Sequence, residues 1–160
     1  MKKIIFLGII VAAALIQSTL AHHIRFLGVK PDLFFVIVFS AALNFEKDTA
    51  VGLALVCGIL KDSLGLSSFG VHVILFPLWS LTVLSLSKRI SFDHPVVSSS
   101  FLAVMVFVNA VILSILPVAG YGYVHFFSFM RISLIEAAYT SLVFVYAGQW
   151  LRKVAVSTMW

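Results

Sequence analysis

Long apolar runs separated by short charged stretches make up almost the whole chain. The runs cover residues 4–21, 31–45, 49–62, 69–87, 96–116 and 132–150. They do not alternate between apolar and polar positions, so they predict helices and not the strands of a membrane barrel. A membrane-spanning helix needs about 20 apolar residues. We therefore predict an all-α integral membrane protein, a bundle of six transmembrane helices in a single domain over residues 1–160, with short second and third helices.

The composition supports this prediction and excludes other classes of protein. Of the 160 residues, 62% are hydrophobic and 11% charged, whereas soluble domains average about 45–50% apolar and about 25% charged residues. The net charge of +5 includes no basic block longer than a pair such as Lys88–Arg89, so no nucleic-acid partner is expected. The single cysteine, Cys57, excludes an internal disulfide and a multi-thiolate metal site. No metal or cofactor is expected, and the lipid bilayer is the predicted environment.

The distribution of basic residues predicts the orientation in the membrane. One set of alternate connections contains Lys2, Lys3, Lys47, Lys88, Arg89, Arg152 and Lys153. The other set contains Arg25, Lys30, Lys61 and Arg131. Because cytoplasmic connections are enriched in Lys and Arg, both termini are predicted to be cytoplasmic.

The third run has a stripe of small residues that ends in a carboxylate. Ala50, Ala54, Gly58 and Asp62 recur at intervals of four, which places them on one helix face, where small residues allow close helix packing. An ionisable side chain inside a bilayer costs about 2.5–3.5 kcal/mol at the centre. Asp62 is therefore expected either to order the turn before the fourth helix or to bind a partner or ligand. In the first case Asp62→Asn is nearly neutral, and in the second it weakens binding.

The residues around this turn fit either interpretation of Asp62. Gly65 and Gly70 permit unusual turn dihedrals. His72, just inside the fourth helix, is placed to meet Asp62 across the turn. Asp32, which follows Pro31, is expected near the positive end of the second helix dipole.

Structural roles account for the other polar residues in the runs. Glu136 follows Arg131 by five residues, so local pairing or snorkelling accounts for it. Asn109 and Gln17 are predicted to form hydrogen bonds between helices. No glycine-rich phosphate loop, nucleophile elbow or pair of carboxylates in one short segment is present. We predict no catalytic residue and no enzymatic activity.

Residues 30–89 resemble the MreD family, the rod-shape-determining membrane proteins of bacteria. The resemblance lies in three motifs in the family's order: Lys-Pro-Asp-Leu-Phe at 30–34, Gly-Ile-Leu-Lys-Asp-Ser-Leu at 58–64, and Leu-Ser-Ser-Phe-Gly-Val-His at 66–72. The chain departs from the family pattern at Ser68, where proline is common, and at Lys61, where an aliphatic residue is usual.

The resemblance implies a non-enzymatic scaffold in the bacterial inner membrane. Its fold would be similar to the substrate-binding subunit of energy-coupling-factor vitamin transporters. Its expected partner is an MreC-like single-span protein, in a complex with actin-like MreB and a wall polymerase and transpeptidase that guides lateral peptidoglycan synthesis. The positions expected to shape the bundle or a partner surface are Asp32, Gly58, Asp62, Gly65, Gly70 and His72.

Two other functions remain open from the sequence. A transporter subunit that binds a vitamin-sized molecule suits the aromatic set Tyr121, Tyr123, His125 and Phe126, although such residues also form interfacial belts. A membrane enzyme acting on lipid-linked wall precursors is less favoured, because no acid–base or metal constellation is visible.

Overall fold

The computed structural model describes residues 2–19, 29–64, 70–115 and 126–157, and every element in these ranges is an α-helix. The helices are α1 (Lys2–Thr19), α2 (Leu33–Asn44), α3 (Lys47–Leu64), α4 (Val71–Ser87), α5 (Pro95–Ile115) and α6 (Phe126–Ser157). The predicted all-helical class and the order of the helices are confirmed.

The helix boundaries differ most from the prediction in α3 and α6. With 12 residues, α2 is about 18 Å long, which confirms a short second helix. The third helix has 18 residues and is not unusually short. The last helix, α6, has 32 residues and extends beyond the predicted span of 132–150 at both ends. The span was placed between charged residues, and the helix continues past them because Arg and Lys are good helix formers.

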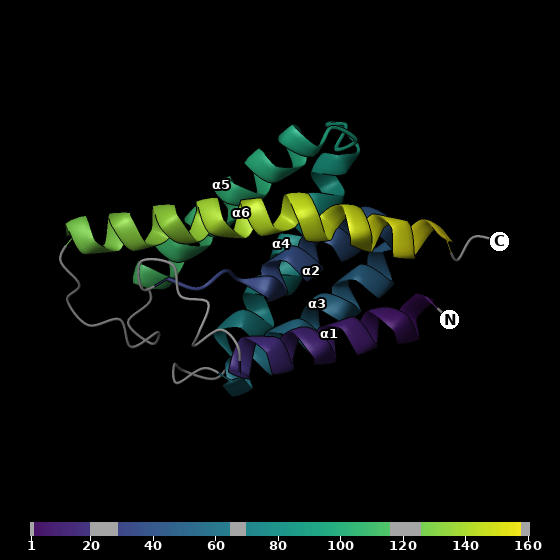
Figure 1. Ribbon diagram of the computed structural model, residues 1–160, viewed down its shortest axis with the longest axis horizontal. Coiled ribbons are helices and arrows are strands. Elements are labelled where there is room, and N and C mark those ends of the chain that lie inside the picture. Colours follow the sequence, from purple (N-terminus) through teal and green to yellow (C-terminus); the bar gives the residue numbers. More distant parts are fainter. Residues whose placement is uncertain (1, 20–28, 65–69, 116–125, 158–160) are drawn as a thin grey trace.

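Helix α2 occupies the centre of the bundle (Figure 1) and packs against α1, α3, α4, α5 and α6. Nine consecutive residues, from Phe34 to Ala42, are buried. A helix that is apolar on every side is stable when it is surrounded by protein or lipid. The short second run therefore forms the core of the bundle and does not face lipid along its length.

Helices α3 and α4 form the closest helix pair, and the predicted small-residue stripe lies at their contact. Ala50 and Ala54 are fully buried, and Gly58 and Asp62 are buried with them. A Cβ atom on Gly58 would lie 2.5 Å from the carbonyl oxygen of His72. The backbones of the two helices thus approach so closely that only glycine fits at this position.

Aromatic side chains fill much of the remaining core. The ring of Phe39 on α2 makes edge contacts with Phe92 at 5.8 Å and with Phe144 at 5.1 Å between centroids. Phe35 meets Phe76 of α4 at 5.3 Å. These pairs connect α2 with α4, α6 and the segment before α5, so several phenylalanines serve as packing residues inside the bundle.

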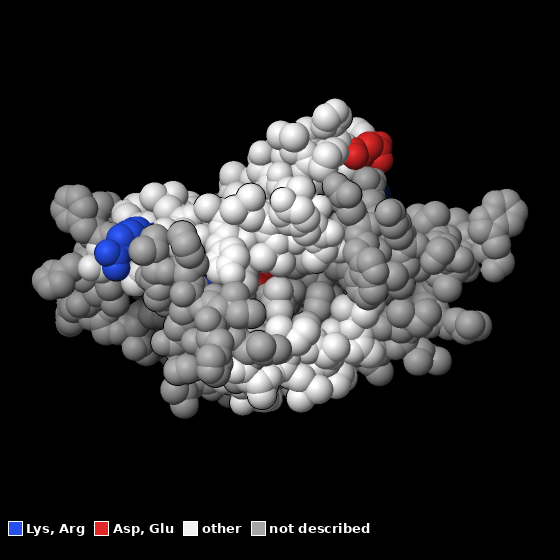
Figure 2. Space-filling view, in the orientation of Figure 1, with Lys and Arg blue, Asp and Glu red and all other residues white. Residues whose placement is uncertain are grey.

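Many exposed side chains in the described residues are large and apolar. Two helical stretches in the described residues are long and apolar enough to cross a membrane, Pro95–Ile115 and Ser128–Gly148. Large apolar side chains point outward, among them Ile74 (71% exposed), Ile115 (74%) and Tyr146 (80%). The described part of the face in Figure 2 is almost uncharged, with a basic group toward its left end and an acidic group at its upper edge. Helix α1 begins and α6 ends at the same end of the molecule (Figure 1).

Candidate functional site

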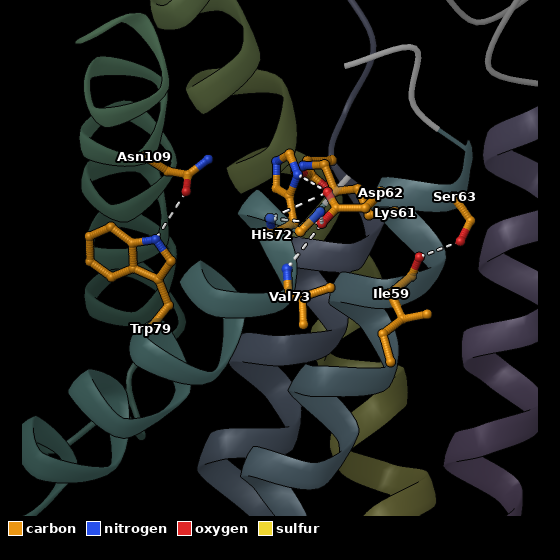
Figure 3. Close-up of polar contacts among 10 residues, drawn as sticks. Ile59, Lys61, Asp62, Ser63, His72, Val73, Trp79 and Asn109 are labelled. Atoms are coloured by element: carbon orange, nitrogen blue, oxygen red, sulfur yellow. Dashed lines mark hydrogen bonds and ion pairs between the residues drawn. The ribbon is translucent and has the colours of Figure 1, made fainter. Parts of the chain in front are cut away.

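Asp62, in the last turn of α3, caps the beginning of α4. Its carboxylate accepts hydrogen bonds from the backbone N–H groups of Gly70 (2.9 Å), His72 (3.0 Å) and Val73 (3.2 Å) (Figure 3). The N-cap residue of α4, Gly70, has a positive φ of 106° and no side chain with which to cap the helix. The first N–H groups of a helix lack partners within the helix. Asp62 therefore supplies from another helix the acceptor that an N-cap side chain normally provides.

The side chain of His72 adds a fourth donor to the same carboxylate. Its Nδ1 lies 2.6 Å from Oδ1 of Asp62, and because an ionised carboxylate only accepts hydrogen bonds, Nδ1 carries the proton. The imidazole packs edge-on against Phe76 at 5.4 Å. Its Nε2 is buried and has no hydrogen-bond partner among the described residues. The predicted Asp62–His72 contact is thus present, with one hydrogen-bonding position of the ring unused.

Lys61 extends the cluster to the beginning of α2. Its ammonium forms an ion pair with Asp32 and lies 5.1 Å from the centroid of the Phe76 ring. Asp32 is also the N-cap of α2, where its carboxylate accepts a hydrogen bond from Phe35 N at 3.2 Å. The predicted location of Asp32 at the positive end of α2 is confirmed, while its ion-pair partner was not predicted.

One face of α6 completes the cluster, and sequence reasoning missed it. The backbone N–H of Asp32 donates to Thr140 Oγ1 at 3.0 Å, and Glu136 lies within electrostatic range of Asp32 and Lys61. Of the two explanations expected for Glu136, an ion pair with Arg131 is not present among the described residues, and snorkelling stays a prediction. Glu136 is half-buried, between the buried residues Ser133 and Thr140 on α6. The spacing of Ser133, Glu136 and Thr140, three and then four residues, was the available signal for a polar face.

A second polar contact crosses from α4 to α5. Trp79 Nε1 donates to Asn109 Oδ1 at 3.0 Å, as Figure 3 shows. The prediction of an interhelical hydrogen bond from Asn109 is confirmed. The similar prediction for Gln17 is not, because its Oε1 atom is buried and has no hydrogen-bond partner within the described ranges.

The polar cluster is better suited to fixing helices than to chemistry. Both oxygens of Asp62 are occupied by N–H donors, and Asp32 is held by Lys61 and by its own helix. Neither carboxylate is placed to accept a proton from a substrate. The structure brings together the predicted positions Asp32, Gly58, Asp62, Gly70 and His72. Gly65 and the residues Tyr121, Tyr123 and His125 lie outside the described residues, and Phe126 is the first residue of α6.

Comparison with known proteins gives a family match over nearly the whole chain. A family model described as rod shape-determining protein MreD matches residues 2–154. The match extends well beyond residues 30–89, where the motifs lie, and includes α1, α5 and most of α6. No curated protein and no solved structure matches the chain.

Proposed function

The chain belongs to the MreD family of rod shape-determining membrane proteins, and we propose that it acts as a non-enzymatic scaffold of the bacterial cell-elongation complex. Family membership assigns it a role in rod-shape determination. The proposal adds a location in the cytoplasmic (inner) membrane, six transmembrane helices with both termini in the cytoplasm, and a direct partner, an MreC-like single-span protein. Through that partner the scaffold contributes to lateral peptidoglycan synthesis by a wall polymerase and transpeptidase guided by actin-like MreB.

The observation that supports a scaffold most strongly is that the carboxylate of Asp62 is fully engaged in hydrogen bonds within the bundle. Four N–H groups donate to this buried carboxylate. A general base must keep a lone pair available to the proton that it removes. Asp62 instead joins the end of α3 to the beginning of α4, and Lys61 and Asp32 join the same corner to α2 and α6. A rigid corner of this kind suits a protein that presents a fixed surface to a partner.

The alternative of a vitamin-binding transporter subunit remains a prediction from the sequence. A small-molecule site is typically a concave, mostly apolar pocket with a few convergent polar groups. The polar residues at the centre of this bundle bind one another, and the cavity lined by residues 87–93 lies at the connection between α4 and α5. No described feature favours the transporter function over the scaffold.

Depletion of the chain in the cells that make it tests the proposal. Rod-shaped cells should become round or wide, and the MreC-like protein should co-purify with the chain in mild detergent. Asp62→Ala should reduce both shape rescue and co-purification. Asp48→Ala, which changes an exposed aspartate in the first turn of the same helix, is the control and should rescue fully. Unchanged cell shape after depletion, together with the absence of such a partner, would refute the proposal.

A further inference from the structure

A cavity of about 410 Å³ lies where the connection between α4 and α5 meets the end of α2. The residues that line it are Leu43, Ser87, Lys88, Arg89, Ile90, Ser91, Phe92 and Asp93. Its volume falls within the range of roughly 300–1,000 Å³ that is typical of small-molecule sites. The connection lies at the edge of the molecule opposite α1 (Figure 1), well separated along the chain from the Asp62 cluster.

The connection between α4 and α5, which lines the cavity, is packed against the bundle. Phe92 is 6% exposed and packs between Phe39 and Phe101. The carbonyl oxygen of Phe92 accepts a hydrogen bond from Ser98 Oγ at 2.7 Å, which ties the connection to the first turns of α5. Phe92 is therefore fixed to both α2 and α5 and anchors the connection whose residues line the cavity.

The charge of the lining favours an anion. Two cations, Lys88 and Arg89, line the cavity, and neither has an ion-pair partner in the part of the chain that is described. The lining contains one carboxylate, Asp93, which already accepts a hydrogen bond from Ser91 Oγ at 2.7 Å. The positive end of the α5 dipole follows at Pro95 and adds to the positive potential.

The depth of the cavity relative to a bilayer identifies the kind of anion. Helix α5 has 21 residues with a mean hydropathy of 2.4, which makes it about 31 Å long and matches the hydrocarbon thickness of about 30 Å. Its beginning at Pro95 therefore lies at the boundary between hydrocarbon and headgroups. The cavity, lined by residues just before Pro95, lies at the level of the lipid phosphates. The lining also includes apolar side chains, among them Ile90, which is 37% exposed.

We propose that this cavity, between the end of α4 and the beginning of α5, binds the phosphodiester headgroup of an anionic phospholipid through Lys88 and Arg89. Basic pockets at the cytoplasmic ends of membrane helices recognise such headgroups by charge. This proposal does not depend on the scaffold function, because it follows from the cavity, its charge and its depth relative to a bilayer.

Native mass spectrometry of the full chain in detergent tests the proposal with phosphatidylglycerol and phosphatidylcholine of the same acyl chains. Phosphatidylglycerol should bind more tightly, and Lys88→Gln/Arg89→Gln should raise its dissociation constant about 25-fold, since each basic side chain near a lipid surface contributes about fivefold. The matched control is Lys30→Gln/Arg131→Gln, which removes the same charge from exposed positions outside the cavity. The control should bind phosphatidylglycerol within twofold of the unaltered chain.

Non-specific attraction and a site for free phosphate each give a distinct result. Equal binding of the two lipids, or equal loss in the control variant, would overturn the proposal because attraction would then be non-specific. Displacement of phosphatidylglycerol by millimolar inorganic phosphate would show a site for free phosphate and would also overturn it. A second measurement requires no variant: phosphatidylglycerol should raise the melting temperature of the unaltered chain more than phosphatidylcholine does, and the difference should shrink as salt is added. The absence of any difference would contradict the proposal.

Discussion

Gly58→Ala tests whether the α3–α4 contact depends on backbone approach. A Cβ atom at this position would lie 2.5 Å from the His72 carbonyl oxygen, 2.8 Å from its carbonyl carbon and 2.8 Å from Val73 Cα. All three are backbone atoms of α4, so no side-chain rotation relieves the overlap. Favourable contacts between carbon atoms lie at about 3.5–4.0 Å, and the helices must separate by about 1 Å to accept the methyl group.

Separating the helices would also weaken the hydrogen bonds by which Asp62 caps α4. Overpacking in a core costs about 1–3 kcal/mol. The bonds from Gly70, His72 and Val73 to Asp62 measure 2.9–3.2 Å, and a shift of about 1 Å takes them beyond hydrogen-bonding distance. Each lost bond adds about 0.5–1.5 kcal/mol. We expect Gly58→Ala to lower the free energy of unfolding by about 3 kcal/mol or more.

Denaturant titration in detergent, followed by the intrinsic tryptophan fluorescence of the chain, measures this change. Gly52→Ala is the matched control, because Gly52 lies on the same helix and a Cβ there meets no atom within 4 Å. Alanine is a better helix former than glycine by about 1 kcal/mol, so the control should be neutral or slightly stabilising. If both variants unfold at the same denaturant concentration, the close approach of α3 and α4 at Gly58 is refuted.

Three further predictions concern the polar contacts, each measured by the same unfolding titration. Asp62→Asn should destabilise the protein by about 1–3 kcal/mol, because both carboxylate oxygens accept N–H donors and an amide offers one acceptor; no loss would contradict the cap. Lys61→Met should cost about 3–5 kcal/mol by leaving the Asp32 carboxylate buried without its ion-pair partner. The double variant Lys61→Met/Asp32→Asn should lose less stability than the two single variants lose together. Strictly additive losses would exclude an interaction between Lys61 and Asp32. Trp79→Phe should cost about 0.6 kcal/mol for the hydrogen bond plus the lost packing, and only the packing loss should remain once Asn109 has been replaced by leucine.

Sequence reasoning reaches its limit at Asp62. If Asp62 orders the turn, the sequence alone predicts that Asp62→Asn is nearly neutral, whereas the hydrogen bonds in the structure predict a loss of stability. The spacing of Gly58, Asp62, Gly70 and His72 predicted two close helices joined through a polar segment, and the described residues on either side of it pack closely. The number of donors on the carboxylate follows from the position of the first turn of α4 beside Asp62. That position depends on how the helices pack, which no local pattern specifies.

The sequence by itself determined the helices, their order and the small-residue face of α3, because these follow from local composition and from periods of three and four residues. It also contained the Pro-Asp start of α2 and the family motifs. Only the tertiary structure decided that α2 is the buried centre and that Asp32 meets Lys61 and Thr140, which are 29 and 108 positions away. Such contacts depend on the arrangement of whole helices around α2. In a chain that is apolar on nearly every face, hydrophobic periodicity does not specify which sides pack together.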